Sequence, residues 1–341
     1  MKPQNNSYVN TSKHNSAMYI TLSLLVVVLF SVSQKSYGLD PVFSQFYANP
    51  LYLNPAFAGA RQCTRVILNY RNHPFPSFGT FSTYSFSADT YSPKLAGGIG
   101  LNIIHDSQAG LLSHSQAGAF YAWQGRLSRD WNISLGIQAS WINYRLQANN
   151  LVFPDQYNPY GSPNNQSGET LDHAFSHHNA DFSTGLLVYN QRFYAGASVH
   201  HLSKPSIDVF TEYDLSRKYT LMMGYDIAPP HLQNTQSGGV SFSPNIIIQS
   251  QSDYLRLNLG MYAHLAMLTA GLWYRHSFQH QNSLIFTFGV KQVNYAIGYS
   301  YDHSLSGFSA NGSGAHEIGV LLNFNCPVSE RKYRILNCPT F

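Results

Sequence analysis

The chain has 341 residues and a formal net charge of +4, and only 11% of its residues are charged while 14% are aromatic. Soluble domains carry about 25% charged residues, so this composition argues against an ordinary soluble enzyme, and 44% apolar residues argue against a disordered chain. Beyond the first forty residues, no apolar run reaches the roughly 20 residues of a spanning helix. These exclusions leave a β protein whose exterior is uncharged and rich in aromatic residues.

Residues 1–38 have the pattern of a secretory signal peptide. They contain three lysines and no acidic residue, an apolar stretch at 20–32, and small residues at Ser36 and Gly38. We predict export and cleavage after Gly38. The alternative is an N-terminal membrane anchor, which the shortness of the apolar run disfavours. Loss of the leader takes the formal charge from +4 to +1, so nothing supports a nucleic-acid partner.

The sequence contains three cysteines, Cys63, Cys326 and Cys338. An exported chain meets oxidising conditions, in which disulfides form. Cys326 and Cys338 lie close together near the C-terminal end, so they could form a disulfide. Free thiols are equally compatible with the sequence.

The rest of the chain is a series of segments in which apolar residues alternate with polar ones. In 254–263, Leu255, Leu257 and Leu259 share one face, while Arg256 and Asn258 share the other. This alternation indicates a strand with one apolar and one polar face. About fourteen such segments occur, near 63–71, 80–89, 95–105, 115–126, 131–147, 181–189, 192–202, 217–226, 239–249, 254–263, 266–275, 283–290, 293–301 and 316–324.

These segments are close in length to strands that cross a bilayer at a tilt, about 9–11 residues. Short turns alternate with longer loops, which is typical of outer-membrane barrels. We therefore predict an all-β transmembrane barrel of about 14 antiparallel strands in the outer membrane, with both termini on the periplasmic side. The pattern is broken at 227–238 and 250–253. The longer loops are predicted at 72–79, 106–114, 148–180, 203–216, 276–282 and 302–315.

No motif predicts catalysis, a metal site or a cofactor. His173, His177 and His178 lie near acidic residues, but a polar loop explains them better than a zinc site. The adjacent His200 and His201 would point to opposite faces of a strand. The sequence contains no G-x-S-x-G turn and no phosphate-binding loop.

Residues 40–59 read D-P-V-F-S-Q-F-Y-A-N-P-L-Y-L-N-P-A-F-A-G. This block closely resembles the opening of the PorP/SprF family, outer-membrane components of the Bacteroidetes type IX secretion and gliding system. Further blocks resemble the family in the same order, although His73 and Pro74 stand where Q-W is more usual. They are Y-R-N at 70–72, L-V-F-P-D-Q-Y at 151–157, V-H-H-L at 199–202, G-L-W-Y-R at 271–275, G-Y-S-Y-D at 298–302 and C-P-T-F at 338–341.

The resemblance implies a non-enzymatic secretion component in the outer-membrane lipid. Such proteins support export or surface attachment of cargo such as large adhesins, together with periplasmic and lipoprotein subunits of the machinery. The expected mechanism is scaffolding. A porin or hydrophobic-solute channel is the alternative, and a barrel enzyme is a weaker third.

The N-terminal segment 39–62 is too apolar for a free tail, and its prolines prevent long helix or strand pairing. It must therefore pack in the lumen, along the periplasmic rim or against a partner. Under the partner hypothesis, the contacting residues are Asp40, Pro41, Phe43, Ser44, Gln45, Asn49, Pro50, Asn54, Pro55 and Gly59.

The last predicted strand resembles the signal read by the barrel assembly machinery, through Glu317, Gly319, Leu322 and Phe324. The predicted organisation is a signal peptide at 1–38, a periplasmic or luminal segment at 39–62, the barrel at 63–324 and a periplasmic tail at 325–341.

Overall fold

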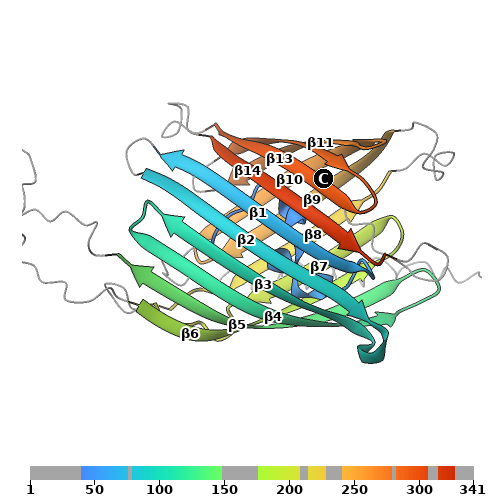
Figure 1. Cartoon of the computed structure of the whole chain (residues 1–341), viewed down its shortest axis with the longest axis horizontal. Helices are drawn as coiled ribbons and strands as arrows, with labels where there is room; N and C mark the ends of the chain where they lie inside the picture. Colours follow the sequence, from blue (N-terminus) through green and yellow to red (C-terminus); the bar gives the residue numbers. More distant parts are fainter. Residues whose placement is uncertain are drawn as a thin grey trace, which may run out of the picture. The chain divides into compact units, whose positions relative to one another are not determined.

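The computed structural model describes residues 40–75, 79–147, 176–207, 214–227, 240–278, 282–305 and 314–326. Within these ranges, fourteen antiparallel strands form one closed barrel (Figure 1). Each strand pairs with its neighbour in sequence, and β1 (Thr64–Phe75) closes the barrel against β14 (Ala315–Phe324). The predicted fold is confirmed. No helix in the described part of the chain is long and apolar enough to cross a membrane.

The other strands follow in chain order. They are β2 (Gly79–Ser92), β3 (Gly97–Gln108), β4 (Leu112–Arg126), β5 (Asn132–Leu146), β6 (Ser176–Tyr189), β7 (Phe193–His200), β8 (Lys218–Tyr225), β9 (Val240–Gln251), β10 (Tyr254–Leu265), β11 (Leu268–Ser277), β12 (Ser283–Lys291) and β13 (Tyr295–Ser304). Short helical turns are η1 (Phe46–Ala48), α2 (Pro50–Leu53), η2 (Pro55–Phe57) and η3 (Pro93–Leu95).

The alternation read from the sequence matches the two faces of the wall. On β10, Asn258 and Tyr262 are fully buried inside the barrel, while Leu259 and Met261 are exposed on the outside. Apolar side chains face lipid on such a barrel. Closure is required because an unpaired sheet edge in lipid would leave backbone N–H and C=O groups without partners.

Several strands run further than the sequence predicted. The loops predicted at 72–79 and 106–114 are wrong, because β1 to β4 continue through most of these residues. His73 pairs with Phe81, and Asp106 pairs with His114. The predicted strands ended where the alternation of apolar and polar residues stops. The backbone pairing continues beyond that point through polar residues. The two long connections at 147–175 and 201–217 share one end of the barrel, here called the loop end. The opposite end, where β1 begins, is called the turn end.

A disulfide joins Cys63 to Cys326 across the seam between the first and last strands. Thr64 pairs with Phe324 in that seam, which brings the flanking cysteines to a Cα separation of 4.5 Å. The sequence had suggested a bond between Cys326 and Cys338. That pairing is wrong, because Cys326 is bonded to Cys63 instead. Cys338 lies outside the described residues.

Candidate functional site

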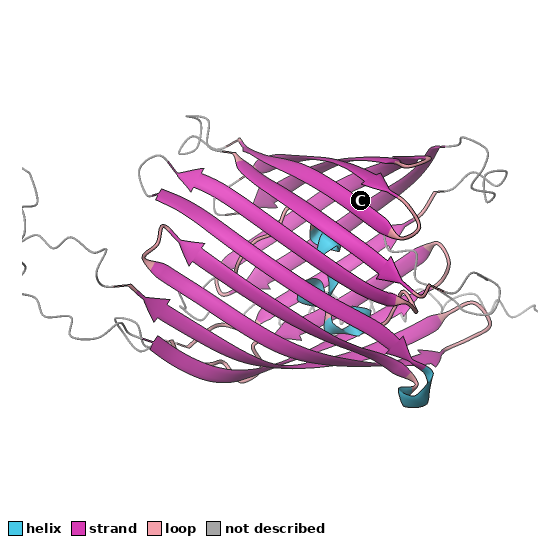
Figure 2. Cartoon of the chain, in the orientation of Figure 1, coloured by secondary structure: helices cyan, strands magenta, loops and turns pink. Residues whose placement is uncertain are grey.

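Residues 40–62 fold inside the barrel, where they form a segment here called the plug. Figure 2 shows its short helices enclosed by the ring of strands. Every side chain from Asp40 to Ala60 is buried except those of Val42 and Tyr52, which are half-buried. Pro50 and Pro55 each start a helical turn, a position that needs no backbone N–H.

The plug extends along the lumen from one end of the barrel to the other. It leaves β1 at the turn end through Cys63, and Asp40 lies at the loop end. There Asp40 contacts Lys218, the first residue of β8, and Gln251, the last residue of β9. The even number of strands places the start of β1 and the end of β14 together at the turn end. Asp40 lies at the opposite end, because the plug runs through the lumen before β1 begins.

Apolar side chains of the plug pack against apolar residues on the inner wall. Phe46 lies against Trp273, with ring centroids 4.7 Å apart, and Tyr47 meets Tyr262 at 6.4 Å. Met222 of β8 belongs to the same buried cluster. Burying an apolar side chain of this size contributes about 1.5–3 kcal/mol. Apolar residues at inward positions were the overlooked signal for a filled lumen.

Glycines in the wall let the plug backbone approach closely. A Cβ on Gly136 of β5 would lie 2.2 Å from the amide nitrogen of Ala56. A Cβ on Gly185 of β6 would lie 1.9 Å from the side-chain oxygen of Asn54. Both distances are far inside van der Waals contact, so the wall at these positions is shaped to the plug.

Close to Asp40 in the sequence, Ser44 and Gln45 are held by charged side chains of the wall. The carboxylate of Glu317 accepts the backbone N–H groups of Ser44, at 2.6 Å, and Gln45, at 3.3 Å. The Ser44 hydroxyl donates to Asp302 at 2.9 Å and accepts from Arg71. Asp302 is also paired with Arg71 at 3.2 Å.

Arg275 of β11 completes this network. Its guanidinium donates to Asp302 at 2.7 Å, to the carbonyl of Phe43 at 2.9 Å and to the side-chain oxygen of Asn258 at 3.1 Å. Hydrogen bonds to charged groups contribute about 1.5–3 kcal/mol each. The buried charges therefore bind the plug to β1, β10, β11, β13 and β14 together.

At the loop end, Asp40, Asp181, His201 and Lys218 form a second charged cluster, here called the clasp. His201 lies between the two carboxylates, with Nε2 3.0 Å from Asp40 and Nδ1 2.9 Å from Asp181. Lys218 donates to Asp40 at 2.9 Å. The clasp joins the far end of the plug to the strands β6 and β8 and to the residue after β7.

The clasp fixes two protonation states. Burial alone would raise the pKa of Asp40, but His201 and Lys218 outweigh it and hold that pKa well below the ordinary value. Burial alone would lower the pKa of His201, but Asp40 and Asp181 raise it to about 9. At neutral pH, the clasp therefore contains ionised Asp40 and protonated His201.

The remaining polar residues of the plug also bond to the wall. Asn49 donates to Ser85 at 2.7 Å, Asn54 donates to the carbonyl of Leu186 at 3.0 Å, and the Gly59 N–H donates to Asp89 at 2.8 Å. The ten residues predicted to contact a partner are thus brought together inside the lumen. Their side chains face the wall or each other, and partner binding by them stays a prediction.

The four residues of the predicted assembly signal lie on β14. Glu317 points into the lumen and binds the plug, whereas Phe324 is exposed. Gly319 pairs with Gly298 of β13, and Leu322 is half-buried. A role in assembly stays a prediction for all four.

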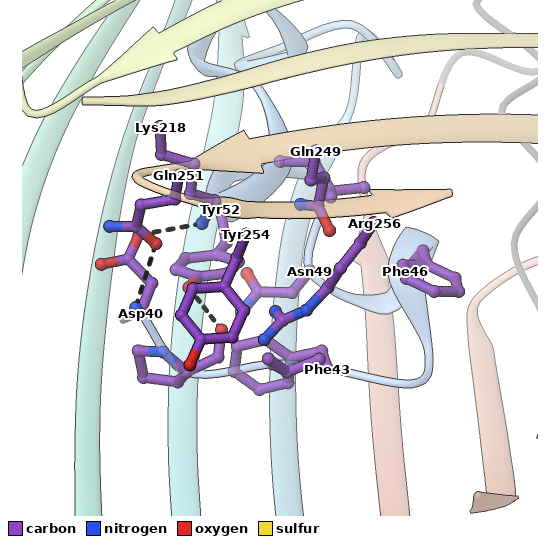
Figure 3. A pocket seen from close by; sticks show the side chains of 13 residues that line it. Asp40, Phe43, Phe46, Asn49, Tyr52, Lys218, Gln249, Gln251, Tyr254 and Arg256 are labelled. Carbon is purple, nitrogen blue, oxygen red and sulfur yellow. Dashed lines mark hydrogen bonds and ion pairs between the residues drawn. The ribbon is translucent and has the colours of Figure 1, made fainter. Parts of the chain in front are cut away.

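The described residues contain no group of three or more His, Cys, Asp or Glu placed to hold a metal ion. His173 of the weighed histidine cluster lies outside them. A small cavity with a volume of about 30 Å³ lies beside the plug near the loop end (Figure 3). This space holds one or two water molecules.

Comparison with known proteins gives one family match. The model of a family described as "Type IX secretion system membrane protein PorP/SprF" matches residues 35–322. A search of curated proteins found no match.

Several solved structures match the chain at low identity. The Ralstonia pickettii toluene transporter TbuX is 10% identical, with 80% of this chain and 92% of that chain covered and a TM-score of 0.46. The P. putida toluene transporter TodX is 10% identical, with the same coverages and a TM-score of 0.44. The Acinetobacter baumannii protein Omp33 is 7% identical, with 78% and 100% covered and a TM-score of 0.41. Identities this low concern the fold alone.

Proposed function

The chain belongs to the PorP/SprF family of type IX secretion system membrane proteins, and from this premise we propose that it is a non-enzymatic scaffold of that system. The barrel anchors the protein in the outer membrane. Its two ends bind partners, which are subunits of the secretion machinery on one side and secreted cargo such as a large adhesin on the other. In this proposal the lumen is a structural core and carries no solute.

The observation that carries the proposal is the filled lumen. A solute could cross only if the plug left, and withdrawal would break the contacts of Ser44 and Gln45 with Glu317 together with the clasp at Asp40. It would also expose Phe46 and Tyr47, which are almost fully buried. Because the plug fills the lumen, we infer that this barrel acts by binding partners on its outer surfaces.

The proposed binding surfaces lie at the two ends. The longest connection, 147–175, is at the loop end, where we place contacts with cargo or surface partners. We place the machinery at the turn end, around the seam at Cys63 and Cys326 and the tail 327–341 that follows it. Because the plug residues face inward, partners would meet the rims of the barrel instead.

The test combines two measurements on the full-length protein. A tagged copy is solubilised from outer membranes and its partners are identified, and the purified protein is studied in planar bilayers. The scaffold proposal expects recovery of secretion-machinery proteins or an adhesin, together with silent bilayers. Removing 148–175 should lose cargo but keep machinery. Stable conductance without any recovered partner would support a porin or hydrophobic-solute channel instead.

A further inference from the structure

Three hydrogen-bonding side chains in the cavity near the loop end have no partner among the described residues. They are the guanidinium of Arg256, the amide of Gln249 and the hydroxyl of Tyr254, and all three line the cavity. Figure 3 shows them entering it from β9 and β10. Arg256 and Gln249 are directly opposite each other in the β9–β10 pairing, so their side chains leave the wall side by side.

Arg256 differs from the other lumen cations named above. Arg71 and Arg275 both bind Asp302, and Lys218 binds Asp40. Four side chains act electrostatically on Arg256: Arg275 and Arg71 carry the same charge as it does, while Tyr52 and Tyr254 favour its charged form but are hydroxyl groups without a full negative charge at neutral pH. A half-buried cation with only cations near it is electrostatically unfavourable, because it has lost part of its hydration without gaining a counter-charge.

The single acidic residue in the lining does not relieve this. Asp40 lies in the same cavity, but Lys218 and His201 already occupy its carboxylate. Apart from Asp40, Lys218 and Arg256, the lining groups are uncharged, among them the rings of Phe43 and Tyr254. Aromatic walls with a few convergent polar donors are typical of ligand sites.

We propose that this cavity binds a carboxylate, which pairs with Arg256 and accepts hydrogen bonds from Gln249 and Tyr254. The flat fork of a guanidinium matches the two oxygens of a carboxylate. The volume of about 30 Å³ admits such a group and leaves the rest of the ligand outside, towards the loop end. The carboxylate could belong to a small organic acid or to a polypeptide. This inference does not depend on the scaffold proposal.

Binding can be measured by calorimetry on the full-length protein in detergent. The probes are acetate, N-acetylglycine, N-acetylglycine amide and chloride. We expect acetate and N-acetylglycine to bind and the amide, which lacks the charge, to bind at least tenfold more weakly. Chloride should also bind at least tenfold more weakly than acetate, because it cannot engage both sides of the fork.

Arg256→Gln should weaken acetate binding at least tenfold and Tyr254→Phe about threefold. Since Arg256 has no partner to lose, its replacement should leave the melting temperature unchanged or raised. If Arg256→Gln fails to fold, Arg256→Lys serves as the second variant. It keeps the positive charge but lacks the planar guanidinium, so acetate should still bind several-fold more weakly than to the wild type. The matched control is Arg126→Gln, an exposed cation at the turn end, which should bind as the wild type does.

The probes also separate the two sources of the carboxylate. Tighter binding of N-acetylglycine than of acetate would point to a polypeptide, and equal binding to a small acid. The proposal is overturned if acetate does not bind, if Arg256→Gln binds it as tightly as the wild type, or if chloride binds as tightly as acetate.

Discussion

Asp40 and His201 are 161 positions apart in the sequence, yet the carboxylate of Asp40 lies 3.0 Å from Nε2 of His201. This contact fastens the far end of the plug to the wall. The near end is fastened covalently, because Cys63 is bonded to Cys326 at the seam. The plug is therefore held at both ends and, between them, by the ion pairs around Ser44.

The clasp makes the stability of the protein depend on pH. The pKa of His201 is about 9 in the folded protein, above the value of about 6.5 in an unfolded chain. Its contribution of about 3 kcal/mol is fully present below pH 6.5 and is lost as the pH rises through 9. The lowered pKa of Asp40 makes its own contribution to the stability of the folded protein, which is present above about pH 4. We expect the melting temperature of the detergent-solubilised protein to fall between pH 6.5 and 9.5.

The control for the pH effect is His201→Gln, which removes the titrating group. Its melting temperature should be lower at pH 6 and nearly flat from pH 6.5 to 9.5. Parallel curves for the variant and the wild type would show that another group controls the pH response.

Asp302→Ala should strongly destabilise the protein. It leaves the buried cations Arg71 and Arg275 without their shared carboxylate, which costs about 3–5 kcal/mol. Ser44→Ala removes hydroxyl bonds only and should cost about 1–2 kcal/mol. Urea unfolding followed by tryptophan fluorescence measures both, since Trp273 lies against the plug. Equal losses in the two variants would contradict the central role of Asp302.

A side chain at Gly185 should displace the plug and leave the barrel intact. The added Cβ of Gly185→Ala would overlap the side chain of Asn54. We expect faster hydrogen exchange at residues 50–58 and intermittent conductance in planar bilayers. Ser183→Ala is the matched control, because it changes an inward residue of the same strand without adding an atom. Unchanged exchange in Gly185→Ala would mean that the wall yields instead.

The disulfide assignment predicts the state of all three cysteines. Alkylation of the unreduced protein should add one group, at Cys338, and peptide mapping should link Cys63 to Cys326. Cys63→Ser should destabilise the protein by about 5 kcal/mol, because the bond closes a loop of more than 200 residues. A linked peptide containing Cys326 and Cys338 would refute the assignment.

The sequence alone was sufficient to predict the barrel. Alternation on β10, with Leu259 outside and Asn258 inside, shows which face meets lipid before any strand is paired. The block at 40–59 was enough to identify the family. These features are local, since the period of a strand and the order of a motif can be read along a single stretch of chain.

The position of the N-terminal segment was decided by the tertiary structure. The apolar character of 39–62 requires burial but does not choose between lumen, rim and partner. That choice depends on Gly136 and Gly185 making room and on Trp273 and Met222 facing inward, which become neighbours only once the barrel closes. The pairing of Cys63 with Cys326 has the same origin. Contacts between distant residues follow from closure and register, which no local pattern specifies. Inward apolar residues could have indicated a filled lumen, but the path of the plug and its individual contacts could not be predicted from the sequence.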